Sequence, residues 1–275
     1  MQAGEYIVDR ILPEMVKAAS KRHQINCQLF SDDWVIKLSK GDKSRWILGY
    51  RFDINAAAAS GLAQDKVATY QVLTDAGIPA LQHVLARSVA SQPMPETELT
   101  QTFGYSPVVM KPLSGTGGRG VQLQPDVRQA LLAIGADAEP AWALSPYREV
   151  YSEYRLILLD GRVLLSYEKI GPTKRGGLKL FNLGLGAVAR DIAPEKLNPK
   201  LSQLAASAVD ELGLRLAAVD VIRTDQELEI LEVNDGLMME NYASQSGENK
   251  DWATDIYDEV ITQMFEQSSR ATLGR

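Results

Sequence analysis

The sequence predicts an α+β fold in which antiparallel hairpins are combined with separate amphipathic helices. Two pairs of apolar, partly β-branched runs are each divided by a short polar turn, which is the pattern of a hairpin. These pairs are residues 153–159 with 162–169 and residues 218–223 with 228–234. A helix is predicted from Pro199 to Leu212, because leucine and alanine recur along one stripe before Gly213.

Composition and charge limit the function classes. The 275 residues are 45% hydrophobic and 23% charged, which suffices for a substantial core. A net charge of −6 argues against a nucleic-acid partner. The single Cys27 excludes an internal disulfide, and the two histidines, His23 and His83, lie in unrelated contexts that make no metal site or catalytic triad. No membrane span or signal peptide is evident, so we expect a soluble cytoplasmic protein with no membrane partner.

The first part of the chain is predicted to form a small module followed by a helix. The elements are a helix over Gly4–Ser20, strands over Cys27–Phe30, Trp34–Leu38 and Arg45–Tyr50, and a helix over Gln64–Ala76. Gly77 closes the last helix, and Ile78-Pro79 favours an extended exit.

Further elements are predicted around the two hairpins. They are a strand over Gln82–Ala86, a loop over Ser91–Glu96, strands over Ser106–Lys111 and Val121–Leu123, a helix over Asp126–Ile134, an extended segment Ala141–Tyr147, a basic loop Gly171–Lys179 and a helix over Trp252–Phe265.

Oxygen-bearing side chains gather on the second hairpin. Glu232 and Asn234 are two residues apart and therefore leave the same face of a strand. A turn centred near Gln226 would set Asp220 opposite Glu232. Two acids and an amide, with no basic neighbour on that face, suit a hard cation such as Mg²⁺. The other interpretation is an amphipathic hairpin with one hydrated face.

A glycine-rich loop lies between two predicted strands. Residues 113–120 include four glycines, whose backbone N–H groups can wrap phosphate oxygens. Lys111, at the end of the preceding strand, can reach a phosphate as a point charge. The loop precedes a strand and no helix, so it is neither a P-loop nor a dinucleotide fingerprint. A flexible hairpin tip beside a solvated lysine would give the same pattern.

Charged residues also mark the first hairpin. Glu153 and Arg155 share one face of a strand, and Lys169 ends the partner strand. The fork of Arg155 matches a phosphoryl group or a carboxylate, although a surface charge ladder is the alternative. The basic side chains of the loop Gly171–Lys179 either bind an anionic substrate or keep the loop soluble.

In their order along the chain, these motifs resemble the ATP-grasp superfamily, and most closely its carboxylate–amine ligases, such as cyanophycin synthetase and the glutamate-adding ligases. The likeness runs from about Asp53 to Asn234. It is carried by Asp65-Lys66, Gly77-Ile78-Pro79, Val108–Pro112 with the glycine loop, Glu153-Tyr154-Arg155, Asn182-Leu183, Asp220 and Glu232-Val233-Asn234.

The resemblance implies an ATP-grasp fold, in which two α+β subdomains sandwich the nucleotide behind a short N-terminal module. The boundaries we expect are 1–64 for the module, 65–144 for the helix and lid, and 145–275 for the C-terminal subdomain with the metal site. The implied cofactors are ATP and one or two Mg²⁺ ions, with Mn²⁺ as the alternative metal. The module is shorter than the usual preceding domain, which suggests that a homodimer or a partner subunit completes the substrate site.

The resemblance also assigns roles to residues. Those implied to bind ATP are Lys66, Lys111, Ser114, Gly115, Thr116, Gly117, Gly118, Gly120, Ser145, Tyr147 and Glu153. Those implied to hold the metal are Asp220, Glu232 and Asn234. Those implied to face the transferred phosphate as catalytic residues are Arg155, Lys169 and Asn182. The chain departs from the family at Ser145-Pro146, where a Gln-Glu pair is common, and at Asp235-Gly236, where a small residue and Pro are common.

The implied activity is the ATP-dependent joining of a small-molecule carboxylate to an amine through an acyl phosphate, on amino acid or peptide substrates. Two alternatives use the same nucleotide site. One is a kinase that phosphorylates a hydroxyl group, and the other is a non-catalytic ATP-binding subunit.

Overall fold

The computed structural model describes residues 10–87, 96–115, 117–137, 139, 141–225 and 227–266. The chain separates into two compact units, one made of Met1–Ala56 with Gly236–Arg275 and the other of Ala57–Asp235. The first unit is therefore built from both ends of the sequence. The boundaries expected after residues 64 and 144 divide the chain differently and stay a prediction. No helix in the described ranges has the length and apolar character of a membrane span.

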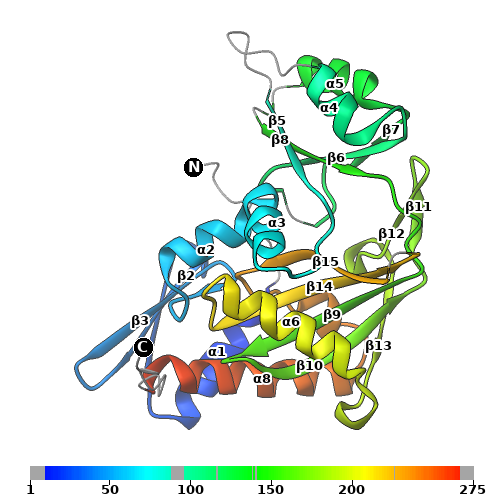
Figure 1. Ribbon diagram of the computed structural model, residues 1–275. Coiled ribbons are helices and arrows are strands. Elements are labelled where there is room, and N and C mark those ends of the chain that lie inside the picture. Colours follow the sequence, from blue (N-terminus) through cyan, green and yellow to red (C-terminus); the bar gives the residue numbers. More distant parts are fainter. Residues whose placement is uncertain are drawn as a thin grey trace, which may run out of the picture. The chain divides into compact units, whose positions relative to one another are not determined.

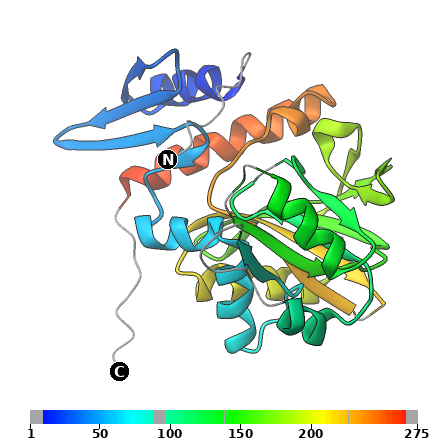
Figure 2. The ribbon, with the colours of Figure 1, turned by 90° about the horizontal axis from the view of Figure 1, so that it is seen from above.

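The discontinuous unit combines a sheet with two long helices. Its antiparallel strands follow the order β1–β2–β3–β4, and α1 packs against α8 (Figure 2). The bounds are Leu12–Arg22 (α1), Asn26–Phe30 (β1), Val35–Lys40 (β2), Lys43–Leu48 (β3), Arg51–Phe52 (β4), Glu240–Ala243 (α7) and Gly247–Phe265 (α8). Arg22, the last residue of α1, and His23, which caps it, both bind Asp258 of α8, with His23 Nε2 2.8 Å from Oδ2.

The larger sheet of the continuous unit has five antiparallel strands in the order β13–β10–β9–β14–β15, with α6 against it (Figure 1). The bounds are Ser152–Leu159 (β9), Arg162–Ile170 (β10), Val188–Asp191 (β13), Leu216–Thr224 (β14), Glu227–Asn234 (β15), Ala57–Gln64 (α2), Lys66–Asp75 (α3) and Pro199–Glu211 (α6). Leu156, Val219 and Val221 of the strands pack with Leu201 and Ala205 of α6 in one apolar core.

A second sheet in the same unit has the order β5–β8–β6–β7, and α4 and α5 cover one of its faces (Figure 1). The bounds are Val84–Arg87 (β5), Glu96–Phe103 (α4), Val108–Pro112 (β6), Gln122–Gln124 (β7), Val127–Ala136 (α5) and Ala141–Pro146 (β8). Val108, Met110 and Leu144 face these helices. Because side chains alternate along a strand, Lys111 and Ser145 belong to the opposite face.

Short elements follow strands β10 and β13 of the larger sheet. They are the hairpin of Thr173–Arg175 (β11) and Leu178–Leu180 (β12), and two 3₁₀ turns at Leu183–Leu185 (η1) and Pro194–Lys196 (η2). The hairpin overlaps the segment Gly171–Lys179 that was predicted as a basic loop and extends one residue beyond it. Thr173 and Lys174 pair there with Leu180 and Lys179, so part of that loop is ordered as a sheet.

Several predicted bounds are wrong for local reasons. The helix predicted over Gly4–Ser20 begins at Leu12 in the described residues, so that Arg10 and Ile11 precede it, and Pro13 lies in its first turn, where proline is tolerated. The helix expected over Gln64–Ala76 spans Lys66–Asp75, because Asp65 is extended and caps it, and a separate helix that was not predicted ends at Gln64. The last helix begins five residues early, at Gly247, capped by Ser246. Helix α4 was not predicted. Residues 4–9 and 91–95 lie outside the described residues.

The cap of α3 generates a stability prediction. The carboxylate of Asp65 accepts hydrogen bonds from the backbone N–H groups of Val67 and Ala68, both 2.9 Å away. Replacing it (Asp65→Ala) should lower the free energy of unfolding by about 1 kcal/mol, since two donors at the helix start lose their acceptor. Asp65→Asn should keep most of the stability. Urea denaturation followed by circular dichroism measures both, and equal midpoints for wild type and Asp65→Ala would contradict the assignment.

Candidate active site

Strand register sets three charged side chains in one row. Strand β14 pairs with β9 on one side and β15 on the other, and Asp220 lies opposite both Arg155 and Glu232. The pairing of Asp220 with Glu232 confirms the predicted hairpin register. The expectation that this face has no basic neighbour is wrong, because β9 brings Arg155 beside Asp220. A bulge between Asp220 and Val221 interrupts the ladder here, as bulges commonly do near active sites.

Asp220 is bound by two cations. Arg155 donates to it in a bidentate manner, with Nε 2.8 Å from Oδ1 and Nη2 2.6 Å from Oδ2. Lys169 Nζ lies 2.9 Å from the same Oδ1 and also donates to Oε1 of Glu153. Asp220 is 1% exposed and Lys169 5%. Burial alone would raise the pKa of Asp220, but Arg155 and Lys169 outweigh it and hold that pKa well below its ordinary value. Burial raises the pKa of Glu153.

The other two residues expected to hold a metal lie next to each other. Nδ2 of Asn234 donates to Oε1 of Glu232 at 3.2 Å and to the backbone oxygen of Ala218 at 3.4 Å. No three Asp, Glu, His or Cys side chains in the described residues are grouped so that they could hold an ion. A carboxylate and an amide nevertheless fit Mg²⁺ where nucleotide phosphates supply further oxygens. Asp220 fits less simply, because Arg155 and Lys169 already occupy its oxygens.

Lys66 holds the base of the glycine loop. It is the first residue of α3, and its Nζ donates to the backbone oxygens of Gly115 at 2.6 Å and Leu113 at 3.2 Å. A Cβ built on Gly118 would lie 3.7 Å from Nδ2 of Asn182, so Asn182 lies beside the same loop. Gly120 has a φ of +68°, and a Cβ there would come within 2.8 Å of Pro112. The tight loop therefore requires glycine at that position.

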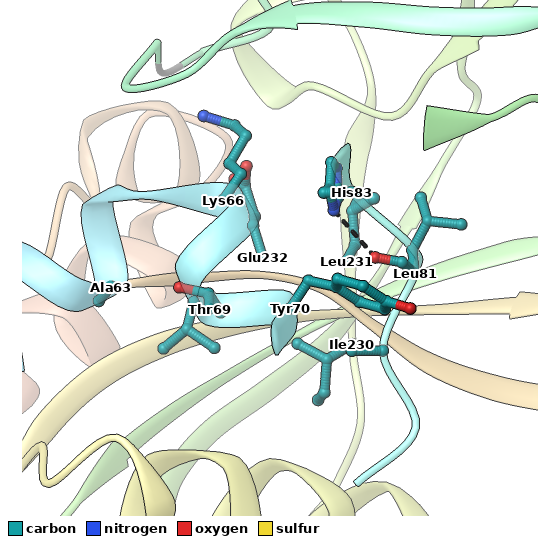
Figure 3. A pocket seen from close by; sticks show the side chains of 11 residues that line it. Ala63, Lys66, Thr69, Tyr70, Leu81, His83, Ile230, Leu231 and Glu232 are labelled. Atoms are coloured by element: carbon teal, nitrogen blue, oxygen red, sulfur yellow. Dashed lines mark hydrogen bonds between the residues drawn. The ribbon is translucent and has the colours of Figure 1, made fainter. Parts of the chain in front are cut away.

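Glu232 lies among the cations of the site. Burial lowers the pKa of Lys66 and of Lys111, and Lys66 lowers that of Lys111 further. The negative charge of Glu232 acts in the opposite direction on both lysines. Burial lowers the pKa of Arg155, but Asp220, with a smaller contribution from Glu232, raises it above its ordinary value. Figure 3 shows Lys66 and Glu232 on the same side of a small pocket. Two partly desolvated lysines near one acid would be stabilised by an added anion.

The remaining predicted residues are spread around this centre. Ser145 is buried on the face of β8 that lies away from α4 and α5, with its hydroxyl 3.5 Å from the backbone oxygen of Val109. The Tyr147 hydroxyl donates to Glu149, which pairs with Lys179, so this side chain is bound to surface charges. Ser114 and Gly117 are exposed. Thr116 lies outside the described residues.

One buried polar residue was not predicted as part of the site. His83 precedes β5 and lines the same pocket as Lys66 and Glu232 (Figure 3). It is 3% exposed. The only sequence signal was a histidine at the start of a predicted strand, and nothing near it in the sequence marks it as functional.

Solved structures share this arrangement of two sheets. D-alanine–D-alanine ligase from Bacillus anthracis superposes with a TM-score of 0.58 at 18% identity, over 76% of this chain and 68% of that one. The likeness is one of fold, and the fold is that of an ATP-grasp protein. Residues 63–260 match the family described as the RimK-like ATP-grasp domain, and the chain belongs to that family. The predicted fold class and superfamily are thereby confirmed.

The two curated relatives described next share the same description. A probable alpha-L-glutamate ligase from Shewanella pealeana is 25% identical over 198 residues, which cover 70% of this chain and 41% of the relative. One of the same description from Legionella pneumophila is 28% identical over 187 residues, or 66% of this chain and 59% of the relative. The chain therefore spans less than two thirds of either relative.

The buried ion pairs generate a second stability prediction. Asp220→Asn should lower the free energy of unfolding by roughly 3 kcal/mol, because Arg155 and Lys169 would share one buried carboxylate fewer. The control is Asp225→Asn, at an exposed position in the turn after β14. This substitution should change the free energy of unfolding by less than about 0.5 kcal/mol. Urea denaturation at pH 7 measures both.

The difference in the free energy of unfolding between wild type and Asp220→Asn should depend on pH with a definite sign. Because the pKa of Asp220 is depressed in the folded state, its stabilising contribution is present above its unfolded pKa of about 4 and is lost as the pH falls toward the folded value. The difference in the free energy of unfolding between wild type and Asp220→Asn should therefore have its full size at pH 6 and decrease below about pH 4. Equal free energies of unfolding for wild type and Asp220→Asn at pH 7 would contradict the stabilising role of the ion pairs of Asp220 with Arg155 and Lys169.

Proposed function

We propose that the chain is the ATP-grasp domain of a carboxylate–amine ligase, which uses ATP and Mg²⁺ to join an amino acid or peptide carboxylate to an amine. The observation that carries the proposal is the convergence of Lys66, Lys111 and Glu232 beside the base of the glycine loop. Family membership supports ATP as the nucleotide. The description of the relatives makes L-glutamate the first substrate to test.

The nucleotide phosphates would bind between the two lysines. Lys66 now donates to the loop carbonyls of Leu113 and Gly115, and a phosphate oxygen is a stronger acceptor for an ammonium group. We therefore expect Lys66 to exchange these carbonyls for phosphate when ATP binds. The freed loop, with Gly117, Gly118 and Gly120, would then close over the triphosphate, and backbone near Ser145 and Tyr147 would line the base.

Magnesium would be held by Glu232 and Asn234, with Asp220 as the third residue once Arg155 and Lys169 turn toward substrate. The ion would neutralise charge on the nucleotide phosphates during phosphoryl transfer. Mn²⁺ has the same ligand preference.

The reaction needs no nucleophilic side chain. A substrate carboxylate oxygen attacks the γ-phosphorus and ADP leaves, which forms an acyl phosphate. The amine then attacks the acyl carbon and phosphate leaves. Arg155 and Lys169 would spread the negative charge of the transferred group, and Asn182 would contact it from beside Gly118. Loop closure would exclude the water that hydrolyses an acyl phosphate. The homodimer or partner subunit suggested by the resemblance stays a prediction.

The proposed function predicts that ADP release requires two substrates. With Mg–ATP and a panel of amino acids and short peptides, starting with L-glutamate, ADP and phosphate should appear in equal amounts only when a carboxylate and an amine are both present. A coupled ADP assay with mass spectrometry of the product measures this. A phosphorylated product that persists without amine would instead indicate a kinase, and Mg–ATP binding without turnover across the panel would indicate a binding subunit.

The metal assignment predicts a loss of activity at one carboxylate. Glu232→Gln should lower kcat by about 100-fold or more and weaken the Mg²⁺ dependence of nucleotide binding, because one charged oxygen ligand is lost. The control is Glu227→Gln, at an exposed position on the same strand, which should leave kcat unchanged. Thermal unfolding checks that both variants fold. Undiminished turnover in folded Glu232→Gln would remove this residue from the metal site.

A further inference from the structure

The imidazole of His83 is buried with one nitrogen satisfied and one not. Nδ1 lies 2.9 Å from the backbone oxygen of Leu81, drawn as a dashed line in Figure 3. A carbonyl oxygen only accepts hydrogen bonds, so Nδ1 carries the hydrogen and donates it. In the neutral ring Nε2 then carries a lone pair. Among the described residues, Nε2 has no hydrogen-bond partner and is shielded from solvent.

The surroundings keep this ring neutral. Burial lowers the pKa of His83 well below its ordinary value, and Lys111 and Lys66 lower it further. A metal ion at Nε2 would face the same two positive charges, which argues against a cation as the missing partner. A buried acceptor without a donor is rare in folded proteins and calls for an explanation. A neutral hydrogen-bond donor therefore suits this nitrogen, either a water molecule or a donor group of a bound ligand.

The sheet places this acceptor on the face that carries Lys111. Val84 lies opposite Leu144, and both belong to the core under α4 and α5. His83, one residue earlier, lies on the other face, with Ser145 and Lys111. Val109 and Ala143 share that face and offer small apolar side chains, which suit a flat base and not a phosphate.

We propose that Nε2 of His83 accepts a hydrogen bond from the 6-amino group of the adenine base and so helps the site select adenine over 6-oxopurines. The inference rests on the proposed function and deepens it. A triphosphate offers no donor at neutral pH. The 6-amino group of adenine is a donor, whereas the 6-oxo group of hypoxanthine or guanine is an acceptor and would face the lone pair of Nε2. His83 is not among the motifs that carry the family resemblance.

The test compares ADP with IDP, which exchanges the 6-amino group for an oxo group. Isothermal titration calorimetry with Mg²⁺ should show that wild type binds ADP about tenfold more tightly than IDP, the size of one net hydrogen bond. His83→Leu should weaken ADP binding about tenfold and leave IDP unchanged, so that the preference disappears. His83→Gln, whose Oε1 can replace Nε2 as the acceptor, should restore part of the preference.

A second measurement needs no variant. The chain has only two histidines, so ¹⁵N-histidine labelling gives two imidazole spin systems, with His23 as an internal control. The Nε2 resonance of His83 should move to lower frequency on ADP binding, as expected for an acceptor nitrogen, and should not do so on IDP binding.

Four outcomes would overturn the inference. An unchanged preference for ADP in folded His83→Leu, or an Nε2 resonance that ADP does not move, would show that the base does not contact His83. His83→Leu could instead weaken the binding of ADP and IDP equally. If the same variant then leaves the binding of 2′-deoxy-ADP or of 3′-deoxy-ADP unchanged, His83 contacts the ribose hydroxyl that this analogue lacks. If wild type binds neither nucleotide, the proposed function fails together with this inference, and that result is distinct from the other three.

Discussion

The antiparallel register of β9, β14 and β15 is the constraint on which the candidate site depends. It sets Arg155, Asp220 and Glu232 in one row across three neighbouring strands. Strands in a sheet are about 4.8 Å apart, so side chains in such a row interact directly. A shift of one residue would turn a strand's side chains to the other face, and the buried apolar residues on these strands, such as Leu156 and Val219, oppose such a shift. The packing of the core thus determines which charges meet.

The charge balance of the site explains what it is suited to bind. Lys66, Lys111, Arg155 and Lys169 outnumber the carboxylates of Glu153, Asp220 and Glu232, although the whole chain carries a net charge of −6. Burying cations without full compensation is unfavourable, and the lowered pKa values of Lys66 and Lys111 express that cost. Lys66 compensates by donating to loop carbonyls. A bound polyanion would supply the missing negative charge and would release the glycine loop from Lys66.

Local patterns in the sequence were sufficient for part of this arrangement. Alternation and turn residues predicted both hairpins and the pairing of Asp220 with Glu232, because these contacts join neighbouring segments. The pairing of Arg155 with Asp220 could not be predicted in the same way, since it depends on which strands of the sheet are neighbours and joins residues 65 positions apart. The contact of Lys66 with Gly115 likewise arises only from tertiary packing, as does the lack of a partner for His83 Nε2 within the described part of the chain. The same reason applies to the unit built from both chain ends.

The most direct test of the central claim is a crystal structure of the protein with Mg²⁺ and a non-hydrolysable ATP analogue. The account predicts triphosphate oxygens within hydrogen-bonding distance of both Lys66 Nζ and Lys111 Nζ, with the ion bound by Glu232 and the glycine loop folded over the phosphates. A nucleotide bound elsewhere, or phosphates that contact neither lysine while Lys66 remains bonded to the loop carbonyls, would contradict it.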